Sequence, residues 1–141
     1  MKIENVIKKF NQEEIYLCPK CLSESHIEGI SLVCNENHRY DFSKKGYIHL
    51  INNYKPTKYS EDLFKARSEV FSNGFYENVL KNIQNLIEKY AKDVVLDIGC
   101  GEGYYIKKLK TVFLEKYFYG LDNSKDAIEL AVREDKLNPY M

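Results

Sequence analysis

The chain lacks a net charge and a long apolar run, and its first residues do not show the pattern of a leader peptide. Its 21 lysine and arginine residues balance 21 aspartate and glutamate residues, so any nucleic-acid surface must be a local patch. No apolar run approaches the ~18–20 residues of a membrane span. The N-terminus has neither the apolar core nor the cleavage site of a signal peptide. We therefore expect a cytoplasmic protein with no membrane segment.

Length and composition indicate an ordinary globular protein. The 141 residues, 44% apolar and 30% charged, suit one domain or a small module joined to part of a larger one. Internal repeats and low-complexity segments are absent from the sequence. Four cysteines in a reducing compartment are more plausible as metal ligands or buried thiols than as disulfides.

The first motif has the spacing of a zinc site, C-x2-C-x12-C-x3-H. Paired ligands two or three residues apart can face one ion from a tight turn, and two such pairs complete a tetrahedron. The alternative, four unrelated residues, requires two close pairs to arise by chance within 21 residues. Four protein ligands leave no open position for water, which predicts a structural zinc ion. The predicted ligands are Cys18, Cys21, Cys34 and His38.

The remaining histidines and cysteine are expected to be no part of that site. His26 has no close partner in the sequence, and His49 alternates with apolar residues on an expected strand. Cys100 lies inside a glycine-rich loop and is most simply a small buried residue.

The second motif is that loop, which follows an apolar strand and precedes a helix. Gly99, Gly101 and Gly103 allow close approach of a ligand and positive φ angles. The spacing does not fit the dinucleotide fingerprint G-x-G-x-x-G, because Tyr104 occupies the third glycine position. Taken alone, a glycine-rich turn could be a plain connection between a strand and a helix.

Two acids make the loop more specific. Asp97 lies two residues before the first glycine, and Asp122 ends the next expected strand, where a carboxylate can accept hydrogen bonds from both ribose hydroxyls. Together they favour a nucleoside cofactor without a pyrophosphate. The pattern is typical of S-adenosylmethionine sites in Rossmann-like methyltransferases.

Apolar periodicity predicts a mixed α/β chain in two parts. Residues 1–51 are expected to form an N-terminal helix and a zinc-binding β module, and residues 52–60 a linker. By the resemblance of the glycine loop to S-adenosylmethionine sites, residues 61–141 are expected to form helices followed by the first β-α-β-α part of a truncated Rossmann-like methyltransferase sheet. Ser60 and Ser124 are plausible helix N-caps. Val94–Ile98 is expected to be a buried parallel strand. The other expected helices are 3–10, 76–90 and 104–109, and the other expected strands are 31–34, 39–42, 47–51 and 117–122.

These motifs together resemble the bacterial 23S rRNA (guanine-N1)-methyltransferases. The resemblance rests on the zinc module, on Ala66-Arg67, and on the segments 42–50, 73–76, 95–105 and 119–128. It implies that the zinc module helps to recognise a 23S rRNA hairpin, and that Tyr76, Gly101 and Glu102 contact S-adenosylmethionine, with Asp122 on the ribose. Asp97, Gly99 and Gly103 complete the expected cofactor-positioning set.

Length is the main departure from the family. A complete sheet of this type has about seven strands, whereas the first begins here only at Val94. Guanine N1 carries a proton that transfer must remove, and we name no catalytic residue for that step. We expect the chain to be inactive alone. An unpaired edge of Val94–Ile98 predicts self-association, a second polypeptide, or poor order after about residue 92. The alternatives are a zinc-stabilised RNA-binding module with a non-catalytic methyltransferase remnant, and a product without function.

Overall fold

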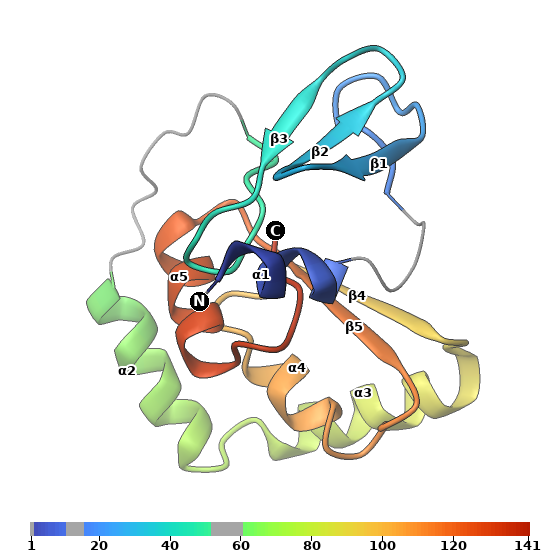
Figure 1. The fold of residues 1–141 in the computed structure, drawn as a ribbon. Coiled ribbons are helices and arrows are strands. Elements are labelled where there is room, and N and C mark those ends of the chain that lie inside the picture. Colours follow the sequence, from blue (N-terminus) through green and yellow to red (C-terminus); the bar gives the residue numbers. More distant parts are fainter. Residues whose placement is uncertain (1, 11–15, 52–60) are drawn as a thin grey trace.

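The fold is mixed α/β and falls into two packed halves. The computed structural model describes residues 2–10, 16–51 and 61–141. A three-stranded antiparallel sheet lies at one end, four helices and a parallel sheet lie at the other, and the short helix α1 (Ile3–Phe10) lies between them (Figure 1). The expected fold class is confirmed. Among the helices in these ranges, none is long and apolar enough to cross a membrane.

The N-terminal half is built from two hairpins. Strand β2 (Ser31–Cys34) pairs with β1 (Ser25–Glu28) on one side and with β3 (Arg39–Asp41) on the other. The predicted helix 3–10 forms, and its apolar stripe packs onto the sheet. The resulting core comprises Val6, Phe10, Cys18, Leu32, Cys34, Tyr40, Phe42 and Ile48.

The strand expected at 47–51 does not form, and that prediction is wrong. Only an isolated bridge joins Ile48 to Phe42. The backbone instead turns toward the C-terminal half, where the Ile48 N–H donates to the Tyr140 carbonyl at 3.2 Å. Tyr47 lies in the core of that half. Alternation of apolar residues here reflects two cores, one on each side of the segment.

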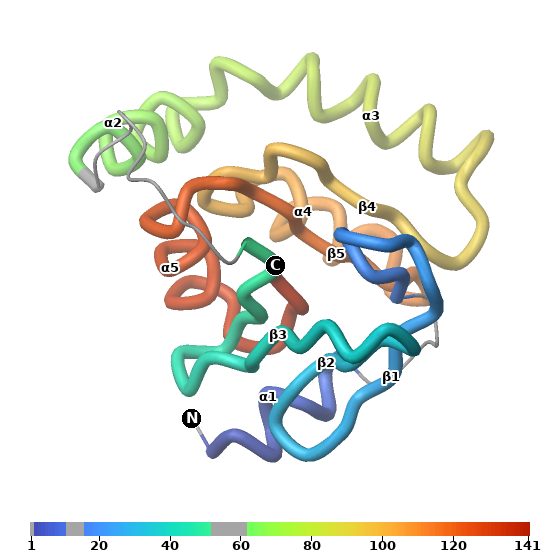
Figure 2. The backbone as a smooth tube through the Cα atoms, turned by 90° about the horizontal axis from the view of Figure 1, so that it is seen from above, coloured from blue at the N-terminus to red at the C-terminus, as the bar shows by residue number. Residues whose placement is uncertain are grey.

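The C-terminal half places helices around two parallel strands. Helices α2 (Glu61–Ser72) and α3 (Glu77–Tyr90) precede β4 (Val94–Ile98), and α4 (Tyr104–Leu109) connects it to β5 (Tyr117–Leu121). Helix α5 (Lys125–Glu134) follows, with the Ser124 hydroxyl accepting the Ala127 N–H as predicted for its cap. Helix α3 runs along the outside of this half (Figure 2). The linker 52–60 and the cap expected at Ser60 lie outside the described residues.

A third segment adds to the parallel sheet. The Gly120 N–H donates to the Pro139 carbonyl at 3.1 Å, and the Met141 N–H donates to the Gly120 carbonyl at 2.8 Å. Residues 139–141 therefore lie parallel to β5 on the edge opposite β4. Within the described ranges, β4 pairs with β5 alone, so its other edge is open.

Strand β4 is less buried than its apolar sequence predicts. Val95 packs into the core formed with α3, α4 and α5. Leu96 and Ile98 alternate to the opposite face of the sheet, where they are 49% and 75% exposed. The expectation of a buried strand is therefore wrong for this face.

The two halves share polar and aromatic contacts. The buried Lys9 ammonium donates to the carbonyls of Lys136 and Asn138, both at 3.1 Å. The rings of Tyr16 and Tyr119 meet edge to face at 6.2 Å. These contacts, together with Ile48, fix the N-terminal half against the end of the parallel sheet.

Candidate functional site

The four predicted zinc ligands converge at one end of the antiparallel sheet. One ligand atom from each of Cys18, Cys21, Cys34 and His38 lies within 4.8 Å of all the others. The histidine faces the sulfurs through Nδ1, at 3.5 Å from Cys18 Sγ and 3.4 Å from Cys34 Sγ. This choice of ring nitrogen is a detail that spacing alone does not give.

The fold supplies hydrogen bonds to the sulfur atoms. The Lys20 N–H points at Cys18 Sγ at 3.4 Å, and the His38 N–H points at Cys34 Sγ at 3.3 Å. Burial alone would raise the pKa of Cys18, but hydrogen bonds from Tyr40 and nearby backbone groups lower that pKa to about 5. A thiolate is the form that binds metal, so this environment suits zinc. All four ligands come from this chain, so a tetrahedral zinc ion bound here would have no open coordination position.

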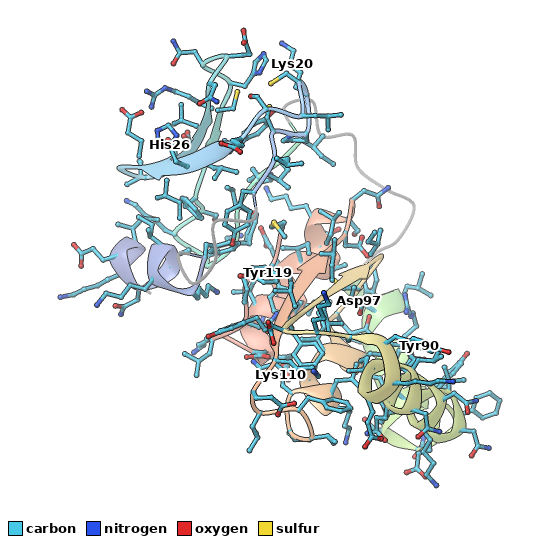
Figure 3. All side chains as sticks on the ribbon, turned by 90° about the vertical axis from the view of Figure 1, so that its right-hand side faces the viewer. Lys20, His26, Tyr90, Asp97, Lys110 and Tyr119 are labelled. Atoms are coloured by element: carbon cyan, nitrogen blue, oxygen red, sulfur yellow. The ribbon has the colours of Figure 1, made fainter. Side chains whose placement is uncertain are left out.

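The histidine at position 26 is separate from this cluster, as predicted. His26 lies on β1 with its side chain exposed, far from Asp97 and Tyr119 of the parallel sheet (Figure 3). It therefore offers a matched control for substitutions at other histidines.

The glycine loop follows β4 and turns into α4 with three positive φ angles. Gly99, Gly101 and Gly103 have φ of 81°, 56° and 74°. A Cβ on Gly103 would lie 2.5 Å from the Tyr140 hydroxyl oxygen. Glycine is thus needed here both for the backbone conformation and for close packing.

Asp122 organises this loop. Its Oδ2 accepts the Gly101 N–H and its Oδ1 accepts the Ser124 N–H, both at 2.8 Å. A carboxylate has about four acceptor positions, so two stay available for a ligand. The sequence suggested a ribose-binding role for Asp122 but not this role in holding the loop.

Two other acids carry buried oxygens without partners. Asp97 Oδ2 and both carboxylate oxygens of Glu102 have no hydrogen-bond partner within the part of the chain that the structure describes. Burial and the nearby Asp122 charge raise the pKa of Asp97. Unpaired buried acceptors are costly, which is typical of a site that awaits a hydrogen-bond donor.

The predicted residues do not all face one space. Glu102 lines a cavity of about 460 Å³ between α2, α4 and α5, together with Lys65 and Arg133. Tyr76 belongs instead to a group of aromatic rings, with its ring centroid 4.9 Å from that of Phe71. Asp97, Asp122 and the three glycines meet at the carboxyl ends of the strands.

One cation beside the loop was not predicted as a site residue. The Arg67 guanidinium lies over the rings of Phe64 and Phe71, each centroid 5.6 Å away. Its nitrogens are 3.6 Å from the position that a Cβ on Gly101 would occupy. Over the described ranges it has no ion-pair partner. The only sequence signal was the Ala66-Arg67 pair within the resemblance.

A cavity of about 470 Å³ opens where the two halves meet. The carboxyl ends of β4 and β5 form one wall, through Ile98, Gly99, Asp122 and Asn123. Residues from the N-terminal half form the other wall, among them Pro19 of the first ligand turn and His49. The N-terminal half thus reaches the end of the sheet where ligands bind in folds of this kind.

Comparisons with known proteins match both halves. Residues 16–55 match the family described as RlmA, N-terminal, a zinc ribbon, and residues 89–140 match a methyltransferase domain. The chain is thus similar to an RlmA-type zinc ribbon and to a methyltransferase domain, each over part of its length. All four predicted ligands fall inside the RlmA-type match, and the glycine loop and Asp122 fall inside the methyltransferase match.

Two curated relatives carry names that agree with these matches. The Bacillus subtilis protein YxjB, named as a 23S rRNA (guanine-N1)-methyltransferase, is 33% identical to this chain over 102 residues. The matched region covers 67% of this chain and 36% of YxjB. The 23S rRNA (guanine(748)-N1)-methyltransferase of Streptomyces fradiae is 28% identical over 82% of this chain and 43% of its own length. The chain therefore spans about two fifths of the length of these relatives.

A solved structure also overlaps with part of the chain. The plantazolicin methyltransferase BpumL, in complex with SAH, has 21% identity and a TM-score of 0.40, covering 57% of this chain and 31% of its own.

Residues between the RlmA-type zinc ribbon match and the methyltransferase match include Arg67 and Tyr76.

Proposed function

We propose that this chain acts in the transfer of a methyl group from S-adenosylmethionine to N1 of a guanine in 23S rRNA. The observation that carries the proposal is the glycine loop, which Asp122 holds at the carboxyl end of β4, beside an RlmA-type zinc ribbon. The names of both curated relatives support the reaction and its substrate. A ribosomal RNA substrate would place the chain in the cytoplasm, and a hairpin of that RNA remains the expected target.

Zinc is proposed to hold the N-terminal half together. The proposed ligands are the three sulfurs and the Nδ1 atom that converge at the end of the antiparallel sheet, from Cys18, Cys21, Cys34 and His38. A closed site of this kind contributes folding energy and leaves no position for substrate. We assign no catalytic step to it.

The cofactor is proposed to lie across the glycine loop. Asp122 retains acceptor positions for the ribose, and the buried oxygen of Asp97 suits the amino group of the methionine part. The Arg67 guanidinium, beside Gly101 and free of ion pairs among the described residues, suits the methionine carboxylate. The remaining proposed contacts are Tyr76, Gly99, Gly101, Glu102 through its place in the loop, and Gly103.

Binding of S-adenosylhomocysteine tests the cofactor proposal. We expect Gly101→Ala to weaken that binding at least tenfold, because a methyl group would enter the space between the loop and Arg67. Gly29→Ala is the matched control, since Gly29 has a similar φ of 61° but lies in an open turn with no atom within 4 Å of the added carbon. Calorimetry should show unchanged affinity for Gly29→Ala. Equal losses in both variants would point to general strain and contradict the proposal.

A second candidate function follows from the separate hydrophobic core of the N-terminal half. That half has its own core, and it would serve as a zinc-stabilised RNA-binding module even if the methyltransferase part were a non-catalytic remnant. A methyl-transfer assay on a 23S hairpin, with this chain and with a lengthened one, separates the two. We expect activity only from the longer chain, and no activity from either would favour the module.

The open edge of β4 is proposed to pair with a second copy of the chain or with another polypeptide. Leu96 and Ile98 are exposed beside this edge, and exposed apolar edge strands invite pairing. We expect light scattering after size-exclusion chromatography to show a species larger than one chain, which Leu96→Lys with Ile98→Lys converts to monomer. Leu114→Lys, at a residue 84% exposed but outside the strand, should leave the mass unchanged. A wild-type chain that is a stable monomer would overturn this proposal.

A further inference from the structure

The cavity between the halves has a largely apolar lining, to which the zinc ribbon half contributes the polar side chains of Tyr47 and His49. Its volume of about 470 Å³ exceeds that of a purine base, and Ile48, Ile51, Ile98, Leu121 and Ile128 supply apolar surface. The half-buried His49 lies in the same lining as Asp122. Pockets for nucleosides commonly combine an apolar lining with a few polar groups that set orientation.

A hydrogen-bond chain fixes the state of His49. The Tyr47 hydroxyl donates to Glu129 Oε1 at 3.2 Å and also lies 3.2 Å from His49 Nε2. A hydroxyl has one hydrogen, so once that hydrogen goes to Glu129, His49 Nε2–H must be the donor in the second contact. The imidazole Nδ1 then carries a lone pair.

The charge state agrees with this assignment. Burial, and the charge of Lys125, lower the pKa of His49, so the ring is neutral at physiological pH. Burial raises the pKa of Tyr47 to about 12, which keeps its hydroxyl protonated and able to donate to Glu129. Lys45 in turn holds the Glu129 carboxylate at 2.8 Å. Among the described residues, the hydrogen bonding of the His49 imidazole is confined to Nε2, so no protein group uses the Nδ1 lone pair.

We propose that the zinc ribbon half builds one wall of an adenine-binding pocket, in which His49 accepts a hydrogen bond from the 6-amino group. The inference rests on the proposed cofactor site, because Asp122 at one end of the cavity would hold the ribose. Asn123 and His49 both line this cavity, so a base attached to that ribose would extend into the space that they border. His49 is a positioning and specificity residue in this arrangement and takes no part in methyl transfer.

The test compares two ligands that differ at the group His49 would recognise. S-adenosylhomocysteine carries a 6-amino donor, whereas S-inosylhomocysteine carries a carbonyl oxygen there. We expect His49→Ala to weaken binding of the first about fivefold, the size of one neutral hydrogen bond, and to leave the second unchanged. His26→Ala, on the exposed face of β1, should alter neither affinity. Equal affinities of His49→Ala and wild type for S-adenosylhomocysteine, or equal losses for both ligands, overturn the inference.

A second readout separates this inference from the proposed function. The imidazole signals of His49 in an NMR titration should shift with adenosine. If the wild-type chain does not bind S-adenosylhomocysteine yet adenosine shifts those signals, the proposed function fails and the pocket stands. Signals that respond to guanosine monophosphate and not to adenosine would show that the cavity takes the target base, which also overturns an adenine pocket.

Discussion

Replacing Cys34 by serine is expected to abolish stoichiometric zinc binding and to unfold the N-terminal half. Cys34 ends β2, its sulfur lies 3.4 Å from His38 Nδ1 and 3.7 Å from Cys21 Sγ, and it is buried in the core beside Leu32. Structural zinc contributes roughly 10–16 kcal/mol in zinc-finger peptides, so loss of one ligand should cost on the order of 5 kcal/mol of unfolding free energy. The described residues of this half form three strands of three or four residues and an eight-residue helix, so the zinc site is expected to supply much of its stability.

The measurement combines elemental analysis with thermal unfolding. Wild type should hold one equivalent of zinc, and chelation should lower its melting temperature as the Cys34→Ser substitution does. Cys100→Ala provides a matched control, because that buried thiol lies in the glycine loop and outside the ligand cluster. It should retain the full equivalent of metal. A metal-free preparation with the melting profile of wild type would refute a structural zinc ion.

Unfolding should also spread beyond the zinc ribbon. Pro19, between the first two ligands, and His49 both line the cavity at the end of the parallel sheet. Loss of zinc is therefore expected to lower affinity for S-adenosylhomocysteine as well as stability. A metal-free chain that binds this ligand as tightly as wild type would show that the cavity wall does not depend on zinc.

The sequence predicted those parts of the site whose residues lie close to one another along the chain. Two close pairs of ligands and three alternate glycines are local patterns, and the ligand cluster and the loop both form where they were expected. The helices were predictable for the same reason, because an apolar stripe repeats every three or four residues. Ser124 caps α5 through a hydroxyl only three residues from its partner.

The parts that were missed depend on contacts between distant segments. The sequence pattern predicts a strand at Tyr47, yet its hydroxyl donates a hydrogen bond to Glu129, 82 positions later. Arg67 reaches the glycine loop from α2, and no pattern in its own helix marks that approach. Residues 139–141 contain a proline and only three positions, too few to predict a strand, yet their backbone pairs with β5. Sequence periodicity does not report such pairings.

Gly120 shows the same limit most clearly. It lies inside β5 with no turn nearby, and a glycine in a strand usually weakens the strand. In the structure the Tyr140 ring occupies the space that a side chain at position 120 would fill. That ring is fully buried and also approaches Gly103 of the cofactor loop. One aromatic ring thus links the third sheet segment to the site.

Gly120→Ala is therefore expected to destabilise the C-terminal half by about 3 kcal/mol, at the upper end of the range for overpacked cores. An added Cβ would lie 2.5 Å from Tyr140 Cδ1 and 2.9 Å from Cys100 Sγ. The φ of Gly120 is not positive, so the cost is steric rather than conformational. Urea unfolding of the variant should show a lower midpoint than either wild type or Gly29→Ala, whose added carbon meets no atom within 4 Å.

A double-mutant cycle identifies the ring as the cause. Tyr140→Ala removes the two closest clashing atoms and leaves only the contact with Cys100 Sγ, so Gly120→Ala should cost much less in that background, and the two substitutions should be strongly non-additive. The clash would also push the Tyr140 ring toward Gly103, so the single variant should bind S-adenosylhomocysteine more weakly at temperatures where it remains folded. Additive destabilisation with unchanged binding would contradict both expectations. The identity of residue 120 would then matter only for the strand, since the ring would be free to move without disturbing the loop.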